Sequence, residues 1–211
     1  MTPVALGLLV AAGVAAVTDW VAVAATLRRL EYVAKPAVMV GLIAVALTLR
    51  PASGAERAFF VAALALGLLS DVFLMLPRDM FLAGLVAALV EHVAYIAGFR
   101  TRQLELGLLV VAVLVSLLSV AIFMPSIYRA LRAGHPSLVW PVFAYVAVFI
   151  VMVASAGGTG SLVALAGALL FFYSDAILAW NRLVKPLPMG RIVNIVPYHL
   201  GVALLVLSLL T

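Results

Sequence analysis

The sequence AFFVAALALGLLSDVFLML, residues 58–76, decides the fold class, because it is apolar over the length of a membrane span and carries one charge, Asp71. A helix needs roughly 20 mostly apolar residues to cross the hydrocarbon core, where an open backbone would find no hydrogen-bond partners. Of all 211 residues, 67% are hydrophobic and 10% are charged, whereas soluble domains hold about one quarter charged residues. The composition excludes a soluble protein and predicts an integral membrane protein.

Seven further apolar segments have a similar length, which predicts an all-α bundle of about eight transmembrane helices. The expected helices cover residues 4–27, 33–49, 58–76, 80–99, 106–125, 139–156, 161–180 and 194–210. Helix breakers are expected at their ends, namely Pro77, Pro125, Pro136 and the run from Gly157 to Gly160. The longest predicted loops, 126–138 and 181–193, are too short for another domain. Residues 1–211 are therefore expected to form a single transmembrane domain, with Met1–Leu27 retained as its first helix and not cleaved as a signal peptide.

The positions of the basic residues predict how the chain is oriented. Loops after the first, third, fifth and seventh helices hold Arg28, Arg29, Lys35, Arg78, Arg129, Arg132, Arg182, Lys185 and Arg191. The opposite loops hold Arg50, Arg57, Arg100 and Arg102. The positive-inside rule places the first set in the cytoplasm and both termini outside a multi-pass protein of the cell membrane. Because the net charge of +5 is spread between apolar segments, membrane lipids are the expected partners and nucleic acid is not.

A short internal similarity indicates two related halves. Residues 70–74 read Ser-Asp-Val-Phe-Leu and residues 174–178 read Ser-Asp-Ala-Ile-Leu, four helices apart and in the same direction. The match is compatible with two parallel four-helix halves around a central polar cavity. Chance similarity between short apolar segments is the alternative.

Ionisable groups inside the predicted helices are the main functional signal, because each costs a few kcal/mol to place in hydrocarbon. They are Asp19, Asp71, Glu91, His92, Asp175 and His199. At 1.5 Å per residue, Asp71, Asp175 and His199 lie roughly 8–9 Å inside the same membrane face. Lys35, Asn181 and Tyr198 belong to the same layer, Asp19 lies slightly deeper, and Glu91, His92 and Tyr95 would line the floor. One polar chamber is the simplest arrangement that satisfies all of them.

Two carboxylates in one low-dielectric chamber predict acid–base chemistry. Asp71 and Asp175 cannot both remain ionised cheaply, so one is expected to hold a proton beside an ionised partner. Structural roles remain open for the other groups: Asp19 could pair with a cation, the histidines could be hydrogen-bonded core residues, and Ser70 and Ser174 could orient the adjacent aspartates or satisfy nearby backbone groups. Cysteine is absent from the sequence and no paired histidine motif exists. No cofactor is predicted, although a metal held by histidines and aspartates is left open.

These motifs together resemble the YhhN family of membrane lysoplasmalogenases. The resemblance is carried by Lys35-Pro36, Gly67 to Asp71, Glu91 to Tyr95, Gly167 through Ser174-Asp175, Trp180-Asn181-Arg182 and Tyr198-His199. It spans most of the chain and keeps the order of the motifs. Trp180 stands where the family has leucine, and His199 stands where it has an aromatic residue.

The resemblance implies hydrolysis of the vinyl ether bond of a lysoplasmalogen, a lysophospholipid, to a fatty aldehyde and a glycerophospho-alcohol. That reaction needs a proton donor and a nearby negative charge, roles that Asp71 and Asp175 would share in an order left open. His92, Tyr198 and His199 are expected to assist catalysis. Substrate would be bound by Lys35, Asn181, Arg182, Tyr95, Ser70, Ser174 and Glu91.

Two other functions fit the same residues. One is a different lipid hydrolase, with or without a metal, acting on an ester or amide. The other is a proton-coupled transporter, for which intramembrane carboxylates and a repeat are equally natural. The sequence does not determine headgroup preference or oligomeric state.

Overall fold

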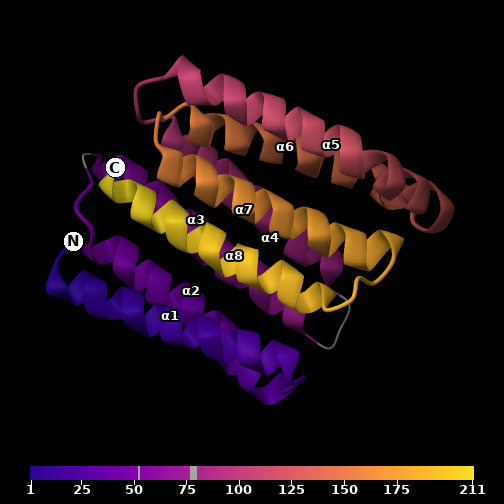
Figure 1. Ribbon diagram of the computed structural model, residues 1–211, viewed down its shortest axis with the longest axis horizontal. Helices are drawn as coiled ribbons and strands as arrows, with labels where there is room; N and C mark the ends of the chain where they lie inside the picture. Colours follow the sequence, from indigo (N-terminus) through magenta and orange to yellow (C-terminus); the bar gives the residue numbers. More distant parts are fainter. Residues whose placement is uncertain (52, 77–79) are drawn as a thin grey trace.

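The computed structural model describes residues 1–51, 53–76 and 80–211, and within them it is a bundle of long helices (Figure 1). Eight helices in this part of the chain are long and apolar enough to span a membrane. They are α1 (Pro3–Ala24), α2 (Arg28–Thr48), α3 (Gly54–Met75), α4 (Phe81–Phe99), α5 (Leu106–Gly134), α6 (Val139–Gly157), α7 (Leu162–Ala179) and α8 (Gly190–Leu207). The predicted all-α transmembrane bundle is confirmed.

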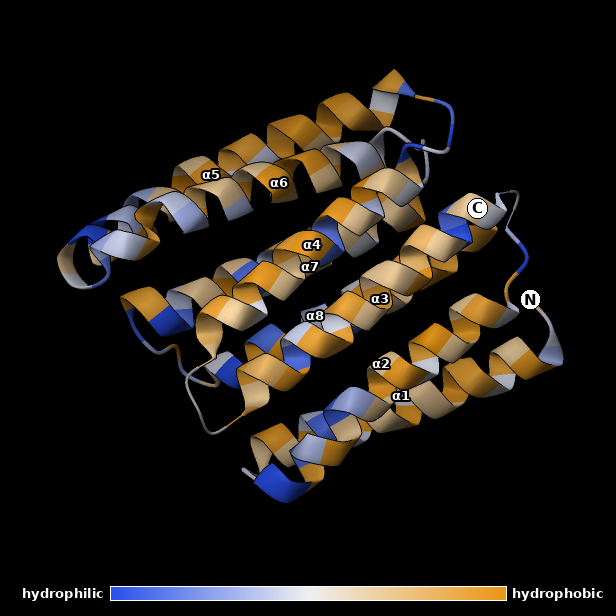
Figure 2. Ribbon diagram, turned by 180° about the vertical axis from the view of Figure 1, so that it is seen from behind, coloured by the Kyte–Doolittle hydropathy of each residue, from blue (hydrophilic) through white to orange (hydrophobic). Residues whose placement is uncertain are grey.

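The helices pack as antiparallel pairs of chain neighbours. In Figure 1, α1 and α2 lie along one side of the molecule and α5 and α6 along the other, with α3, α4, α7 and α8 between them. Both chain ends lie at one end of the bundle. Figure 2 shows mostly hydrophobic residues along the helices, and hydrophilic residues gathered at the helix ends and in the interior. The polar groups inside the bundle are therefore held between helices and away from lipid.

The boundaries of four helices differ from the sequence prediction by four residues or more. Helix α2 begins at Arg28 instead of residue 33, and α3 begins at Gly54 instead of residue 58. Helix α5 continues through Pro125 to Gly134, and α8 begins at Gly190 instead of residue 194. A proline inside a helix removes one backbone hydrogen bond, which a packed membrane bundle tolerates. The predicted helix end at Pro125 is thus wrong, and much of the predicted loop 126–138 is helical. The predicted helix end at Pro77 lies outside the described residues.

The connection between α7 and α8 also contains less loop than expected. A short π-helix, Trp180–Val184, extends α7, and Met189 enters α8 in the left-handed conformation with φ 51°. The wider helical turn of a π-helix is often found at functional sites. This π-helix directly follows the end of α7 that carries Asp175.

The two serine-aspartate motifs occupy equivalent places in the fold. Ser70 of α3 donates a hydrogen bond to the carbonyl oxygen of Gly84 in α4 at 2.9 Å. Ser174 of α7 donates one to the carbonyl oxygen of Asn194 in α8, also at 2.9 Å. Each serine thus ties its helix to the next one, which supports the two-halves arrangement that the repeat suggested.

A glycine contact fixes how closely α7 and α8 cross. A Cβ atom placed on Gly167 would lie 2.9 Å from the carbonyl oxygen of Gly201, and one placed on Gly201 would lie 2.8 Å from the backbone nitrogen of Phe171. Small residues allow such close backbone approach between membrane helices. This contact holds Tyr198 of α8 against α7.

Candidate active site

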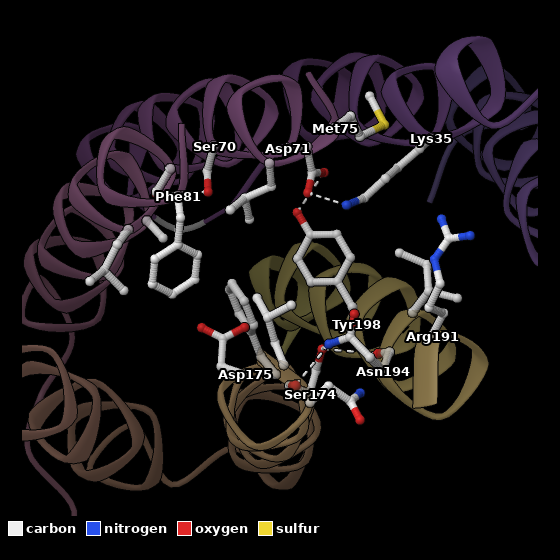
Figure 3. A pocket seen from close by; sticks show the side chains of 18 of the residues that line it. Lys35, Ser70, Asp71, Met75, Phe81, Ser174, Asp175, Arg191, Asn194 and Tyr198 are labelled. Carbon is white, nitrogen blue, oxygen red and sulfur yellow. Dashed lines mark hydrogen bonds and ion pairs between the residues drawn. The ribbon is translucent and has the colours of Figure 1, made fainter. Parts of the chain in front are cut away.

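A polar cavity of about 280 Å³ lies between α2, α3, α4, α6, α7 and α8. Ionisable and hydroxyl side chains from all six helices line it, including Lys35, Asp71, Glu91, Tyr145, Asp175 and Tyr198. Figure 3 shows Asp71 and Asp175 on opposite sides of this space, with Tyr198 between them. A polar chamber is therefore present and both aspartates line it, but the prediction that one chamber holds all the ionisable groups is wrong, because Asp19 and His199 lie outside it.

Asp71 is held by a cation and a hydroxyl group. Nζ of Lys35 lies 2.8 Å from its Oδ1, and the hydroxyl of Tyr198 donates a hydrogen bond to its Oδ2 at 2.8 Å. The Tyr198 ring also faces Lys35, whose Nζ is 5.5 Å from the ring centroid. A carboxylate with a charged donor on one oxygen and a hydroxyl donor on the other is in the arrangement that an ionised group prefers.

Asp175 has a different set of partners. The hydroxyl of Tyr145 in α6 donates a hydrogen bond to its Oδ2, and Nε2 of His92 lies 3.9 Å from the same oxygen. Nδ1 of His92 contacts the carbonyl oxygen of Ala88, which can only accept, so Nδ1 carries the ring hydrogen. In a neutral ring, the Nε2 that faces Asp175 is then a lone pair. Among the described residues, no lysine or arginine is paired with Asp175 as Lys35 is with Asp71.

Glu91 is a further carboxyl group in the cavity wall, to which Glu31 also contributes. The Glu91 side chain is 1% exposed, and its Oε1 has no hydrogen-bond partner among the described residues. Gly67 of α3 makes the room for it, since a Cβ atom at that position would lie 2.5 Å from Oε1. Gly67, which precedes the Ser70-Asp71 motif, thus leaves space for the carboxyl group of Glu91 on the neighbouring helix.

The serines next to the aspartates are occupied by backbone contacts. Besides the bond from Ser174 to Asn194, the side-chain amide of Asn194 donates to the carbonyl oxygen of Ser174 at 2.8 Å and to its hydroxyl oxygen at 2.9 Å. Ser70 and Ser174 both line the cavity. Their hydroxyl groups hold α3 to α4 and α7 to α8, and so position the aspartates that follow them.

The rim of the cavity is basic on one side. Arg28, Lys35 and Arg191 contribute to the wall, and Arg191 forms an ion pair with Glu31 of α2. The Arg191 side chain is half exposed at 50%. An anionic group that enters the cavity from this side therefore meets guanidinium and ammonium groups, although the Glu31 carboxylate paired with Arg191 lines the same wall.

Asn181 lines the cavity, but its side-chain amide is hydrogen-bonded to the backbone of the α7–α8 connection. Its Nδ2 donates to the carbonyl oxygen of Gly190 at 3.0 Å, and its Oδ1 accepts from the backbone nitrogen of Leu187 at 2.9 Å. A Cβ atom at Gly190 would lie 2.5 Å from Oδ1. Asn181 thus fixes the connection that carries Arg191 to the rim.

Four residues predicted for the site do not line the cavity, namely Arg182, Tyr95, His199 and His92. Arg182 points to a separate surface depression that it shares with Arg28, and its Cζ lies 5.3 Å from the centroid of the Phe81 ring. Tyr95 is fully buried against the Phe60 ring, with 5.1 Å between ring centroids. His199 projects from the other side of α8 toward α1.

His199 belongs to a second buried polar cluster. Its Nδ1 accepts a hydrogen bond from Nε1 of Trp20 at 3.1 Å, and its Nε2 lies 4.0 Å from Oδ2 of Asp19. Asp19 is 0% exposed, and neither of its oxygens has a hydrogen-bond partner among the described residues. The histidine and the aspartate face each other in this cluster, and neither contributes to the cavity wall. His92 likewise stays off the wall, although it contacts Asp175.

Metal-ligating side chains do not converge in the part of the chain that the structure describes. No group of three or more histidine, aspartate or glutamate residues there is arranged to hold a metal ion. The nearest approach is the pairing of His92 with Asp175, which supplies two candidate ligands. A catalytic zinc site requires three protein ligands.

Tyr145, Arg191 and Asn194 are cavity residues that the sequence reasoning did not single out. Tyr145 is a lone tyrosine in an apolar helix, where it resembles a core aromatic residue. Asn194 and Arg191 fall at or before the expected start of the last helix, so the sequence places one at the helix edge and the other in a loop. Extending that helix to Gly190 would have placed both on the face that carries Tyr198.

Fold and site together define a multi-pass helical membrane protein with a buried cavity lined by carboxyl groups. The sequence profile of the YhhN family matches residues 30–209, and the chain therefore belongs to this family. Lysoplasmalogenase TMEM86B of Homo sapiens is 31% identical over 164 residues, which are 75% of this chain and 66% of the human protein. Its Sus scrofa counterpart is 34% identical over 163 residues, which are 74% and 66% of the two chains.

The family expected from the sequence motifs is thus confirmed, and the relatives bear the name of an enzyme, as predicted for this chain. The matching region spans just under two thirds of the length of these relatives. No solved structure shows significant similarity to the chain.

Proposed function

We propose that this chain is a lysoplasmalogenase-like intramembrane hydrolase, which cleaves the vinyl ether bond of a lysoplasmalogen into a fatty aldehyde and a glycerophospho-alcohol. One observation carries the proposal: two aspartates with different partners line one cavity, one paired with Lys35 and the other with Tyr145 and His92. Membership of the YhhN family and the names of the relatives support the same reaction class.

Asp175 is the proton donor in this proposal. Hydrolysis of a vinyl ether begins when an acid protonates the alkene carbon that is not bonded to oxygen, which leaves an oxocarbenium ion. Asp175 is suited to hold a proton because it is paired with the neutral hydroxyl group of Tyr145 and a ring nitrogen of His92. Tyr145 fixes the direction of its carboxyl group, and His92 limits the space behind it.

Asp71 is the ionised carboxylate. Its negative charge stabilises the oxocarbenium ion across the cavity and orients a water molecule that adds to the cation's carbon. The water's spare proton passes to a carboxylate, and the resulting hemiacetal collapses with protonation of the departing glycerol oxygen. One water molecule is consumed, and both aspartates return to their starting states.

Basic residues at the rim bind the phosphate of the headgroup. Lys35, Arg28 and Arg191 line the cavity and provide donors for phosphate oxygens. Arg182, which was expected to share this role, lies over Phe81 and outside the cavity wall. In this proposal, Glu91 and Tyr198 line the space that the substrate occupies. Asn181, Ser70 and Ser174 hold together the helices and the connection that form the cavity wall.

The rim is proposed to face the cytoplasm. Most basic residues lie at the bundle end that carries the cavity mouth, so the positive-inside rule orients this end inward and both termini outward. The chain would then act as one transmembrane domain, without a cofactor, on lipids that enter from the inner leaflet.

The direct test is hydrolysis by purified Asp71→Asn and Asp175→Asn variants. Each should insert into the membrane. Asp175→Asn should keep its thermal midpoint near that of the parent, whereas Asp71→Asn should lower it because Lys35 loses its partner. In both variants, aldehyde release from an alkenyl lysophospholipid should fall at least about a thousandfold, as when an acid or a stabilising charge is removed. Mass spectrometry of a mixed lysolipid pool identifies the substrate and both products. Near-normal aldehyde release by both variants would refute the assignment, and loss of ester lipids in place of alkenyl lipids would indicate a different hydrolase.

A further inference from the structure

A second cavity meets the polar one at Asp175. It lies between α4, α5, α6 and α7, with a volume of about 80 Å³. Five residues line both cavities: Phe81, Leu85, Tyr145, Asp175 and Leu178. The carboxyl group of Asp175 therefore stands at the boundary between the two spaces.

The walls of the second cavity are almost entirely carbon. Apart from Asp175 and Tyr145, the only polar lining residue among those described is Ser119. Its hydroxyl donates to the carbonyl oxygen of Val115 at 2.8 Å and lies 3.0 Å from the hydroxyl of Tyr173, so its hydrogen-bonding capacity is used within the protein. A ligand in this space would meet hydrocarbon on every side except at Asp175.

From the polar cavity through Asp175 to the apolar cavity, the lining residues follow the same order as the chemical groups of a single-chain lipid. Lys35 and Arg191 lie on the polar side, Asp175 at the junction, and Met124, Ile127 and Val146 on the apolar side. In an alkenyl lysophospholipid, the phosphate, the vinyl ether and the hydrocarbon chain follow in the same order. The arrangement admits the lipid in one orientation, with the reacting bond at Asp175.

We propose that this apolar cavity, lined by α4–α7, binds the first carbons of the substrate's hydrocarbon chain and sets the position of the vinyl ether against Asp175. The inference rests on the proposed function. The volume of this apolar cavity is about half that of an engineered apolar cavity that binds benzene. The cavity therefore holds a few carbons, and the remainder of the lipid chain extends into the bilayer. Because lipid tails are as apolar as the cavity, its main effect is alignment of the reacting bond.

A photoreactive lipid locates the chain directly. The probe is a saturated alkyl-ether lysophospholipid, which cannot be hydrolysed at a vinyl ether, with a diazirine a few carbons from the ether oxygen. Irradiation with the parent protein in lipid nanodiscs should label Met124, Ile127 or Val146, and unlabelled alkyl lysophospholipid should compete. Label confined to outward-facing residues of α5, such as Leu117 and Leu118, would overturn the proposal.

A pair of matched substitutions on α7 tests the cavity's effect on turnover. Ala179→Phe places a ring in the cavity wall and should lower both cavity labelling and the kcat/KM for alkenyl lysophospholipid at least tenfold. Ala166→Phe makes the same change on the exposed face of α7 and should leave both unchanged. Equal labelling and kcat/KM in the two variants would contradict the chain-binding site.

The outcomes separate this inference from the proposed function. Asp175→Asn should abolish hydrolysis yet keep cavity labelling, because the cavity walls are otherwise intact. Hydrolysis without cavity labelling would refute the chain site alone. Cavity labelling by a parent protein that releases no aldehyde would refute the proposed reaction while leaving a lipid-chain site in place.

Discussion

Replacing Lys35 with methionine tests whether the Lys35–Asp71 ion pair holds the site together. The two side chains are 13% and 5% exposed, and Nζ and Oδ1 are 2.8 Å apart. Lys35→Met keeps most of the aliphatic stem but leaves Asp71 with Tyr198 as its hydrogen-bond donor. Breaking a buried ion pair by removing one partner costs about 3–5 kcal/mol. Since Asp71 borders a cavity with room for water, we expect the lower end of that range, about 3 kcal/mol.

The expected result is a loss of thermal stability that a second substitution restores. For a chain of this size, about 3 kcal/mol corresponds to a midpoint lowered by about 6–12 °C, measured by tryptophan fluorescence in detergent. Lys35→Met with Asp71→Asn leaves no unpaired buried charge, so the double variant should recover more than half of the loss. Lys185→Met, at an exposed position, is the matched control and should stay near the parent.

Two results would refute this reasoning. If Lys35→Met lowers the midpoint no more than Lys185→Met does, the ion pair contributes nothing to the fold. If the double variant is as unstable as Lys35→Met alone, the loss comes from the lysine stem and not from an uncompensated charge on Asp71.

Three further substitutions test other parts of the site. Tyr145→Phe removes the hydroxyl that donates to Asp175, and should lower kcat about 10–100-fold, since a lost bond to a buried acidic group is worth about 1–3 kcal/mol. Gly67→Ala places a methyl group 2.5 Å from Oε1 of Glu91 in the starting geometry, and should lower activity several-fold while the protein still inserts. Arg191→Ala removes a rim cation, and should raise KM for anionic lysolipids more than it lowers kcat.

Each of these changes has a control elsewhere in the chain. Tyr128→Phe alters an exposed tyrosine, Gly13→Ala adds a methyl group with no atom within 4 Å, and Arg129→Ala removes an exposed cation. All three should leave kcat and KM close to the parent values. Equal effects in a test variant and its control would show that the site contact in question does not contribute to turnover.

Much of the fold could be read from hydropathy, because each span must satisfy its own backbone in lipid. Pro125 was the weak point. Proline usually ends a helix in water, and a helix end was expected there, yet α5 continues through it. Pro36 and Pro197 also lie inside helices, as their predicted ranges required. Neighbouring helices compensate for the lost hydrogen bonds, and this compensation depends on packing that a local sequence pattern does not contain.

The candidate site was predictable to the extent that charge in a membrane is costly. Asp71, Asp175, Glu91 and Lys35 stood out for that reason, and all four line the cavity. Tyr145 did not, because a tyrosine in an apolar helix is cheap to bury. Its importance comes only from the neighbouring Asp175 on another helix.

The sequence by itself determined that this is a helical membrane protein of the YhhN family with ionisable groups at similar depths inside its helices. Depth follows from the fixed rise of a helix, so it can be counted along the chain. The tertiary structure decided which of these groups share a cavity. It brought Tyr145 to Asp175 and Lys35 to Asp71, and turned His199 toward Asp19. Such pairings depend on how each helix is rotated against its neighbours, which is set by packing contacts between distant residues, such as that of Gly167 with Gly201.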